Sequence, residues 1–235
     1  MLLRIVVLVT LIAPSLAFAQ SCPAPLSNAR QLVLVTPDTM TSTKATLRRF
    51  VRSSPNARWR ADGGPVTSLI GRNGTAWAHA YRRYASPREP IKVEGDERVP
   101  AGFYRIGPAF GFGASRLPGY LRIGEGVTCV DDVSSPAYNT ITTRARVGWQ
   151  VHGENMWRVP AYRRGLLVDY PTDRRARAGS CVFIHVRLPS STGTSGCVAV
   201  SEPEVERLQQ FSQAGAVLAI VPRQALNRFA GCLPD

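Results

Sequence analysis

Short apolar runs, separated by residues that favour turns, recur along most of the chain. Residues 31–35, 66–70 and 165–170 are such runs, and residues 47–52 alternate between apolar and polar positions. Apolar runs of about four to eight residues between turn signals predict strands, because helices need longer periodic segments. We therefore expect a mostly β chain, with its strands in a β-sandwich or a mixed, largely antiparallel sheet and with a few short helices, rather than a parallel α/β core.

Glycine and proline mark the turns between these runs. Asn73-Gly74 follows the run at 66–70 and is a signal for a hairpin. Residues 99–103 (V-P-A-G-F) predict a Pro-Gly turn that leads into a strand. The glycine-rich residues 107–120 predict a loop, and no Gly-Lys-Ser/Thr sequence follows that would indicate a phosphate-binding motif.

Helical signals are few. Ser201 and Glu204 have the spacing of a capping box, and the apolar positions after them recur on one helical face until Gly215. These apolar positions are Val205, Leu208 and Phe211. Residues 154–163 predict a short helix or a lid, and residues 216–221 predict a last strand.

The first residues of the chain predict a secretory signal peptide, residues 1–19. Arg4 gives a positive start, residues 5–14 are apolar, and Ala17-Phe18-Ala19 is a small-residue cleavage site. The apolar run is short for a membrane span. We therefore expect residues 20–235 to form a single exported domain of the periplasm or cell envelope, with no integral membrane span after cleavage. The alternatives are an uncleaved anchor and lipid attachment at Cys22.

The chain is strongly basic. It has 29 Lys and Arg against 16 Asp and Glu, which gives a net charge of +13. A basic exported protein could bind an anionic polymer such as the cell wall, while export argues against a nucleic-acid partner. The arginines are scattered, however, so a solvated surface kept soluble by charge explains them equally well.

Five cysteines follow the cleavage site, which is an odd number. In an oxidising compartment this count predicts two disulfides and one free thiol. Cys22 and Cys232 lie near the two ends of the mature chain and could pair, which leaves Cys129 and Cys181 as an internal pair. Four cysteines allow three connectivities, so this pairing is one hypothesis among three. Cys197 is the candidate for the free thiol.

Residues 179–200 place a histidine and a cysteine at the two ends of a polar loop. The apolar residues 181–184 predict a strand that runs into His185, and a second apolar run starts directly after Cys197. A loop that folds back between these strands would bring both side chains together. An imidazole can take the proton of a cysteine thiol and so create the nucleophilic thiolate. The alternative is a structural buried cysteine with a core histidine.

The remaining titratable residues carry weaker signals. His79 and His152 fit surface or structural positions, although either could be a second active-site imidazole. Asp131 and Asp132 are adjacent, so in a strand they would point to opposite faces, and we expect turn or strand-end acids rather than paired catalytic carboxylates. No His, Cys and acidic residues have the spacing of a metal site, so we expect no metal.

The stretch around Cys197 resembles the active-site signature of YkuD-type L,D-transpeptidases, in which a histidine is followed by a loop, Ser/Thr-x-Gly-Cys and an aliphatic residue. His185 and T-S-G-C-V at 194–198 match this signature. G-S-C-V-F-I-H-V-R-L-P (179–189) and G-C-V-A-V (196–200) are similar to a divergent bacterial branch. Two positions depart from the family pattern: Ser195 stands where many members have His, and Ala199 where many have Arg.

The resemblance implies the fold of this catalytic domain and a reaction on peptidoglycan stem peptides without a cofactor. Cys197 would attack the carbonyl of the third stem residue and expel the terminal D-Ala, with His185 as the base. Backbone N–H groups of the Ser195-Gly196-Cys197 segment, in the loop that also carries Thr194, would form the oxyanion hole. An amine of another stem would then resolve the thioester into a 3→3 cross-link. The alternatives are an L,D-carboxypeptidase, with water as the acceptor, and a non-catalytic cell-wall-binding protein of the same fold.

Overall fold

A computed structural model describes residues 22–212 and 215–234. The predicted signal peptide lies outside the described residues. None of the helices in the described part of the chain is long and apolar enough to cross a membrane.

Strands dominate the described residues. They are β1 (Gln31–Pro37), β2 (Lys44–Val51), β3 (Arg60–Ala61), β4 (Val66–Leu69), β5 (Thr75–Trp77), β6 (Val99–Gly111), β7 (Leu121–Arg122), β8 (Val127–Cys129), β9 (Ile141–Thr143), β10 (Glu154–Asn155), β11 (Arg164–Asp169), β12 (Phe183–Val186), β13 (Val198–Val200) and β14 (Val217–Ile220). The α-helices are α1 (Ala24–Ser27), α2 (Arg144–Val147) and α3 (Glu202–Phe211), and the 3-10 helices are η1 (His79–Tyr84), η2 (Met156–Arg158), η3 (Pro160–Arg163) and η4 (Arg223–Phe229).

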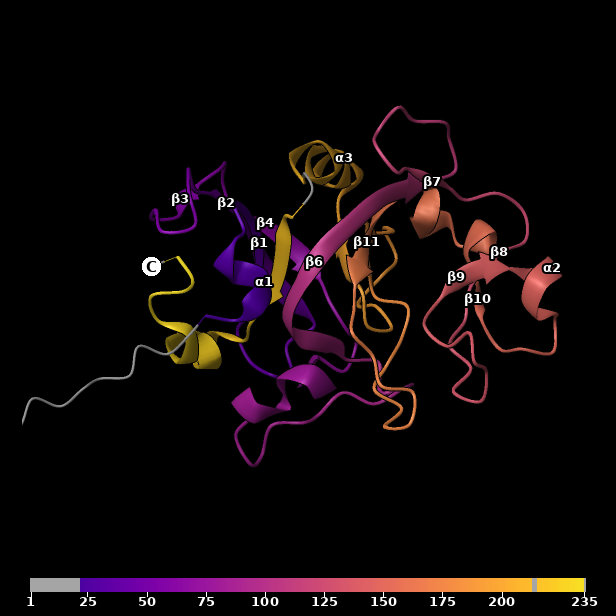
Figure 1. Cartoon of the computed structure of the whole chain (residues 1–235), viewed down its shortest axis with the longest axis horizontal. Coiled ribbons are helices and arrows are strands. Elements are labelled where there is room, and N and C mark those ends of the chain that lie inside the picture. Colours follow the sequence, from indigo (N-terminus) through magenta and orange to yellow (C-terminus); the bar gives the residue numbers. More distant parts are fainter. Residues whose placement is uncertain (1–21, 213–214, 235) are drawn as a thin grey trace, which may run out of the picture.

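Eight of these strands close into a barrel. The hydrogen-bonded order is β1-β14-β6-β11-β12-β13-β4-β2, and β2 pairs back with β1 to close the ring. Within the ring β1–β14 and β12–β13 are parallel and the other pairs are antiparallel. Figure 1 shows the long, curved β6 crossing the molecule, with β1 on one side of it and β11 on the other. The predictions of a mostly β chain, a mixed sheet and a few short helices are confirmed, and the sandwich is not.

The barrel has a filled interior because alternate residues of each strand point inward. Val33 and Val35 of β1, Tyr104 and Ile106 of β6, and Ile184 of β12 all belong to one buried cluster. The residues between them point outward and pack into two other clusters. One, with Leu32, Phe103 and Phe229, lies under η1 and η4, and the other, with Phe110, Phe183 and Cys197, lies beside η2 and η3.

A second, three-stranded sheet of β8, β9 and β10 lies with α2 at one end of the molecule, beyond β11 (Figure 1). Arg144 of α2 is buried and fixes the loop that follows it. Its guanidinium donates to Asn155 Oδ1 at 2.6 Å, and to the carbonyls of Val151 and Gly153 at 2.6 Å each. These charge-assisted hydrogen bonds tie the loop between α2 and β10 to the small sheet.

Two disulfides form, and their pairing is the one proposed from the sequence among the three connectivities that four cysteines allow. Cys22 bonds to Cys232, and Cys129 bonds to Cys181. Among the described cysteines Cys197 alone is free. A Cys22 that is held in a disulfide has no sulfur left for a lipid. Two disulfides are consistent with an exported protein.

The predicted loop at residues 107–120 is wrong in its first part, because β6 continues to Gly111. A Cβ on Gly111 would lie 2.5 Å from the carbonyl oxygen of Arg163, and one on Gly107 would lie 3.1 Å from Cβ of Leu167. These glycines therefore serve close packing against the neighbouring strand rather than a turn. Residues 99–103 are also strand rather than turn, with Pro100 paired to Ala76 in parallel register.

The predicted hairpin at Asn73-Gly74 is wrong as a strand pairing. A turn does form, with Gly74 N donating to the carbonyl of Gly71 at 2.8 Å. The flanking strands do not pair with each other, because β4 joins β2 and β13 while β5 joins β6. The turn signal is local, whereas the strand with which each flanking strand pairs is far away in the sequence.

The capping box at Ser201 is also wrong, although helix α3 is confirmed. Ser201 is the N-cap residue and makes no side-chain cap hydrogen bond. Glu204 is buried and forms ion pairs with Arg49 of β2 and with Arg207 of its own helix. The carboxylate binds two arginines instead of capping a backbone N–H. The predicted apolar face does pack inward, since Val205 and Leu208 are fully buried.

Candidate active site

The register of β12 and β13 decides where the predicted nucleophile and base point. Ile184 pairs with Val198 and His185 with Ala199 in parallel register, and Ile184 and Val198 face the barrel interior. Because successive side chains alternate, His185 and Cys197 point to the outer face. Because the strands run parallel, residues 187–197 return from the end of β12 to the start of β13, and the predicted loop that folds back brings both residues to one face.

This outer face is the floor of a cavity of about 430 Å³. Cys197, His185 and Ala199 line it from the barrel, and Thr194 and Ser195 line it from the connecting loop. Other lining residues come from the small sheet and the loops around it, namely Asp131, His152, Glu154, Tyr162, Cys181 and, across the cavity, Arg72 and Glu94. The structure therefore brings all the residues predicted for the catalytic loop, apart from Gly196, to one cavity wall.

His185 is held in the tautomer that a general base needs. Its Nδ1 lies 3.0 Å from the carbonyl oxygen of Val186, and since a carbonyl can only accept, Nδ1 carries the proton. Nε2 is then the nitrogen with a free lone pair. Burial lowers the pKa of His185 to about 4, so the imidazole is neutral near pH 7. The ring packs edge-on against Tyr162, with centroids 5.3 Å apart.

Cys197 is buried and protonated. Burial raises the pKa of its thiol to about 12, and the carboxylate of Glu154 contributes in the same direction. The backbone N–H of Phe183, the hydroxyl of Tyr162 and the charge of Lys92 favour the thiolate and so act on the pKa in the opposite direction. The thiol lies 3.5 Å from the carbonyl oxygen of Cys181, to which it donates. The pair therefore consists of a neutral thiol and a neutral imidazole, not of a thiolate and an imidazolium.

The loop before Cys197 is braced from inside. The hydroxyl of Thr194 donates to the carbonyl oxygen of Cys197 at 2.7 Å and accepts from Gly196 N at 3.2 Å. Gly196 has φ +142°, a conformation that favours glycine, and a Cβ there would lie 3.3 Å from Arg98 O. Because its N–H is used by Thr194, Gly196 does not supply an oxyanion donor. The N–H groups of Ser195 and Cys197 remain as candidates.

A buried ion pair lies beneath this loop. Lys92 is 3% exposed, and its ammonium pairs with Asp96 and also donates to Val93 O at 3.1 Å. Asp96 accepts further hydrogen bonds from the backbone N–H groups of Val93 and Arg98. A fully hydrogen-bonded pair fixes both the backbone at Arg98 and the Lys92 side chain next to Gly196. The sequence carried no signal for this support.

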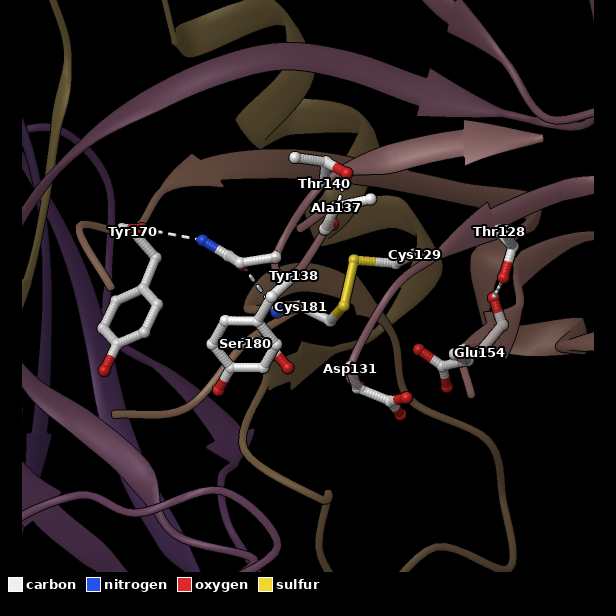
Figure 2. Close-up of a disulfide and its surroundings, with 12 residues drawn as sticks. Thr128, Cys129, Asp131, Ala137, Tyr138, Thr140, Glu154, Tyr170, Ser180 and Cys181 are labelled. Carbon is white, nitrogen blue, oxygen red and sulfur yellow. Dashed lines mark hydrogen bonds between the residues drawn. A yellow bond between two sulfur atoms is a disulfide. The ribbon is translucent and has the colours of Figure 1, made fainter. Parts of the chain in front are cut away.

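Two side chains beside the thiol were missed by the sequence analysis. Tyr162 is buried, donates to Glu154 Oε2 at 2.6 Å and lines the same cavity as Cys197. Burial raises the pKa of the Glu154 carboxyl, and the nearby charge of Asp131 contributes. Figure 2 shows the carboxylates of Asp131 and Glu154 on the same side of the Cys129–Cys181 disulfide. The predicted lid at residues 154–163 contains both Glu154 and Tyr162, and this was the available hint.

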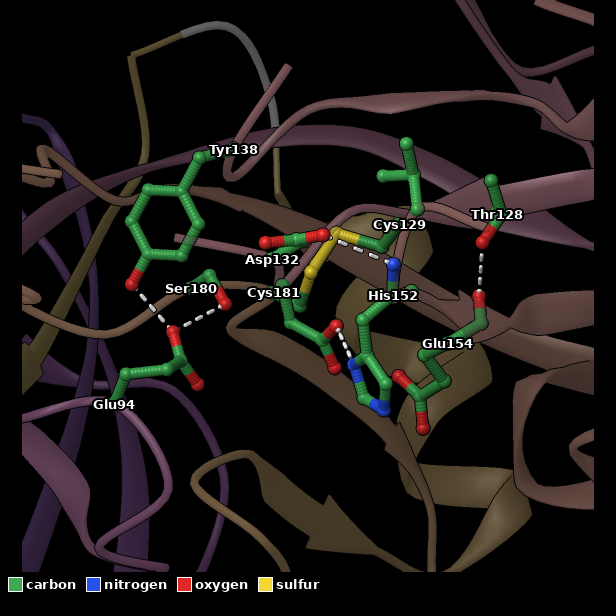
Figure 3. Close-up of polar contacts among 12 residues, drawn as sticks. Glu94, Thr128, Cys129, Asp132, Tyr138, His152, Glu154, Ser180 and Cys181 are labelled. Carbon is green, nitrogen blue, oxygen red and sulfur yellow. Dashed lines mark hydrogen bonds and ion pairs between the residues drawn. A yellow bond between two sulfur atoms is a disulfide. The ribbon is translucent and has the colours of Figure 1, made fainter. Parts of the chain in front are cut away.

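A histidine on the small sheet's side of the cavity has a carboxylate partner. His152 Nδ1 pairs with Asp131 Oδ1, and the backbone N–H of His152 donates to Asp132 Oδ2 at 3.2 Å (Figure 3). The expectation that Asp131 and Asp132 belong to a strand end fits their position just after β8. The two aspartates bind different atoms of His152, Asp131 the ring nitrogen Nδ1 and Asp132 the backbone nitrogen. His79 lies on η1 and bonds with Arg82 of the same helix.

A third carboxylate closes the cavity near the disulfide. Glu94 Oε2 accepts from the hydroxyls of Tyr138 and Ser180, the latter at 2.7 Å (Figure 3).

Among the described residues no group of three or more His, Cys, Asp or Glu side chains could hold a metal ion. Comparison with protein-family models, with curated proteins and with solved structures found no match.

Proposed function

We propose that this protein is a cysteine acyltransferase of the L,D-transpeptidase type that acts on peptidoglycan stem peptides in the periplasm or cell envelope. The observation that carries the proposal is the single free thiol among the described cysteines, Cys197, on the same outer face and in the same cavity as His185. The motif resemblance around these two residues supplies the substrate class.

Acylation would begin from the neutral pair. Nε2 of His185 takes the thiol proton as Sγ of Cys197 attacks the carbonyl of the third stem residue. The imidazolium then returns that proton to the departing amine of D-Ala. Because the pKa of the thiol is raised and that of His185 is lowered, proton transfer accompanies attack rather than preceding it.

The tetrahedral intermediate needs donors for its oxyanion. The N–H groups of Ser195 and Cys197 are the candidates left by the bracing of Gly196. At the cavity rim, Arg72 offers a positive charge for the carboxylate of the leaving D-Ala. Its backbone N–H donates to Thr194 O at 2.8 Å, which ties its position to the catalytic loop. Arg72, whose guanidinium also pairs with Glu97 at 2.8 Å, would supply the charge that Ala199 lacks relative to the family pattern.

The test is mass spectrometry of purified tetrapeptide muropeptides incubated with the mature protein, beside Cys197→Ala. Cross-linked dimers that lack one D-Ala, formed only with an intact Cys197, are the expected result. Tripeptide without dimers would assign a carboxypeptidase. Unchanged muropeptides in both samples would contradict the proposal and favour a protein that only binds the wall.

A further inference from the structure

We propose that His152, oriented by Asp131, is a second catalytic base that removes a proton from an amine acceptor when the acyl group leaves Cys197. The inference rests on the proposed function, since it concerns the second half of the same reaction. It takes the amine acceptor from that function and divides the two half-reactions between two histidines.

The geometry of His152 is that of an oriented base. Nδ1 faces Asp131 Oδ1, which leaves Nε2 as the nitrogen available to a substrate. The backbone N–H bond to Asp132 holds the residue from a second side. The side chain of His152 is 80% exposed while that of Asp131 is 25% exposed, so the imidazole is open to a ligand and its carboxylate partner is partly covered. Figure 3 shows the ring beside Glu154 in this arrangement.

His152 and His185 approach the cavity from different parts of the fold. His185 comes from the barrel floor on β12, while His152 lies in the loop between α2 and β10. His185 is largely buried and belongs to the thiol side, whereas an acceptor must enter from solvent. A base on the open side can reach the incoming nucleophile without displacing His185 from its bond to Val186 O.

The charges around His152 fit a cationic acceptor. Asp131 and Asp132 contact His152, and Glu154, Glu94 and Arg72 line the same cavity, along with the uncharged Cys197, Tyr162 and His185. Among the residues that line the cavity, three carboxyl groups stand against one guanidinium, so the cavity is locally acidic on a chain whose net charge is +13. An alkylammonium group is therefore attracted here, and it must lose a proton before it can attack.

The proposed step balances as follows. The neutral amine attacks the thioester carbon, and Nε2 of His152 takes the proton that the nitrogen loses. The new C–N bond forms as the C–Sγ bond of Cys197 breaks, and the sulfur leaves as a thiolate that takes a proton from solvent. His152 releases its proton to solvent. No oxidant, reductant or metal takes part.

The experiment separates acylation from aminolysis. The mature protein is acylated at Cys197 with p-nitrophenyl acetate, where released nitrophenolate reports acylation, and glycinamide is added as the amine. N-acetylglycinamide is measured by mass spectrometry across pH 5.5 to about 9, with rates expressed per neutral amine. His152→Gln and Asp131→Asn are compared with wild type and with His79→Gln, which changes a histidine outside the cavity.

We expect His152→Gln to slow aminolysis by about 100-fold while acylation stays within about threefold of wild type. In the wild type, the aminolysis rate per neutral amine should fall as the pH is lowered. This fall should be absent from the His152→Gln variant. Asp131→Asn should slow aminolysis less and move that fall to another pH, and His79→Gln should match wild type. Equal losses of acylation and aminolysis, or no loss in either, would overturn the assignment of His152.

Failure of the proposed function has a different signature. If the ester acylates Cys197 and His152 controls aminolysis but muropeptides do not react, the acceptor inference stands and the wall substrate is wrong. If muropeptides form dimers equally well with His152→Gln, the proposed function stands and the inference is wrong. If nothing acylates Cys197 in a folded protein, both are wrong.

Discussion

At the scale of single residues, the two central side chains have pKa values displaced in directions that keep both uncharged. Burial raises the pKa of Cys197 to about 12 and lowers that of His185 to about 4. A buried thiolate–imidazolium pair would need strong compensating hydrogen bonds, and the thiol instead donates to the carbonyl of Cys181. The protein thus holds a buried, uncharged thiol next to an uncharged imidazole.

The raised pKa predicts slow alkylation of Cys197. A raised pKa leaves little thiolate at neutral pH, so the rate with iodoacetamide should keep rising about tenfold per pH unit beyond pH 10. In urea the same thiol should level off near pH 9, because burial is lost. Mass spectrometry of the alkylated peptide at timed intervals measures both rates. Saturation below pH 9 in the folded protein would show that the thiol is ionised far more easily than burial allows.

The lowered pKa of His185 predicts a loss of stability in acid. A group with a depressed folded-state pKa stabilises the fold above its ordinary pKa, and that contribution is lost as the pH falls toward the folded value. Between pH 7.5 and 4.5 this histidine should therefore remove about 2 to 3 kcal/mol from the free energy of unfolding. Urea unfolding of wild type and His185→Gln at both pH values measures the difference. An equal pH dependence in the two proteins would contradict it.

At the scale of elements, the ion pair between α3 and the barrel matters most. Glu204 is 2% exposed, and it links the helix to Arg49 of β2 through a guanidinium that also binds Asp62. The helix packs over β11 and over β12, the strand that carries His185. Loss of this link would therefore affect the site only through the position of α3.

Glu204→Gln should lower the free energy of unfolding by about 3 kcal/mol, because it leaves the largely buried guanidinium of Arg49 with only the half-exposed carboxylate of Asp62 as a charged partner. Glu206→Gln on the exposed face of the same helix is the matched control, with an expected change within about 0.5 kcal/mol. Urea denaturation at pH 7.5 measures both variants. Similar small effects in the two would mean that solvent replaces the buried pair.

At the scale of the whole molecule, two disulfides join parts that are distant in sequence. The two bonds have different roles. Cys22–Cys232 spans a sequence separation of 210 residues in the cluster under η1 and η4. Cys129–Cys181, with a separation of 52, ties the small sheet to the segment before β12 and lies at the cavity. Only the second bond joins the wall that carries His152 to the floor that carries Cys197.

Removing each disulfide should therefore have distinct results. Cys22→Ser/Cys232→Ser should lower the free energy of unfolding by about 3 to 5 kcal/mol and leave acylation near wild type. Cys129→Ser/Cys181→Ser should also destabilise and, in addition, slow acylation and aminolysis at least about tenfold, because the cavity wall shifts. Urea unfolding and the nitrophenolate assay on the folded fraction separate the two effects. Equal activity in both variants would mean that the inner bond does not hold the site.

Particular residues show how much of the fold and of the candidate site could be predicted from the sequence. The strands at 31–35, 66–70 and 165–170 and the inward face of α3 follow from local periodicity, and all of them form. The free thiol followed from an odd count of cysteines, and Cys197 and His185 followed from one motif. The hairpin at Asn73-Gly74 and the capping box at Ser201 failed because a distant strand or a distant arginine offered a better partner.

By itself the sequence determined several of the strands and which of their faces are apolar, since these depend on neighbours within a few residues. It also indicated, from the odd count of cysteines, that one thiol stays unpaired. Only the tertiary structure decided that the sheet closes into a barrel and that β12 and β13 run parallel. It also decided that Glu154, Tyr162 and the Asp131–His152 pair meet the cysteine. Those outcomes depend on pairings between residues far apart in the chain, and no local pattern records the burial and charge that such pairings create.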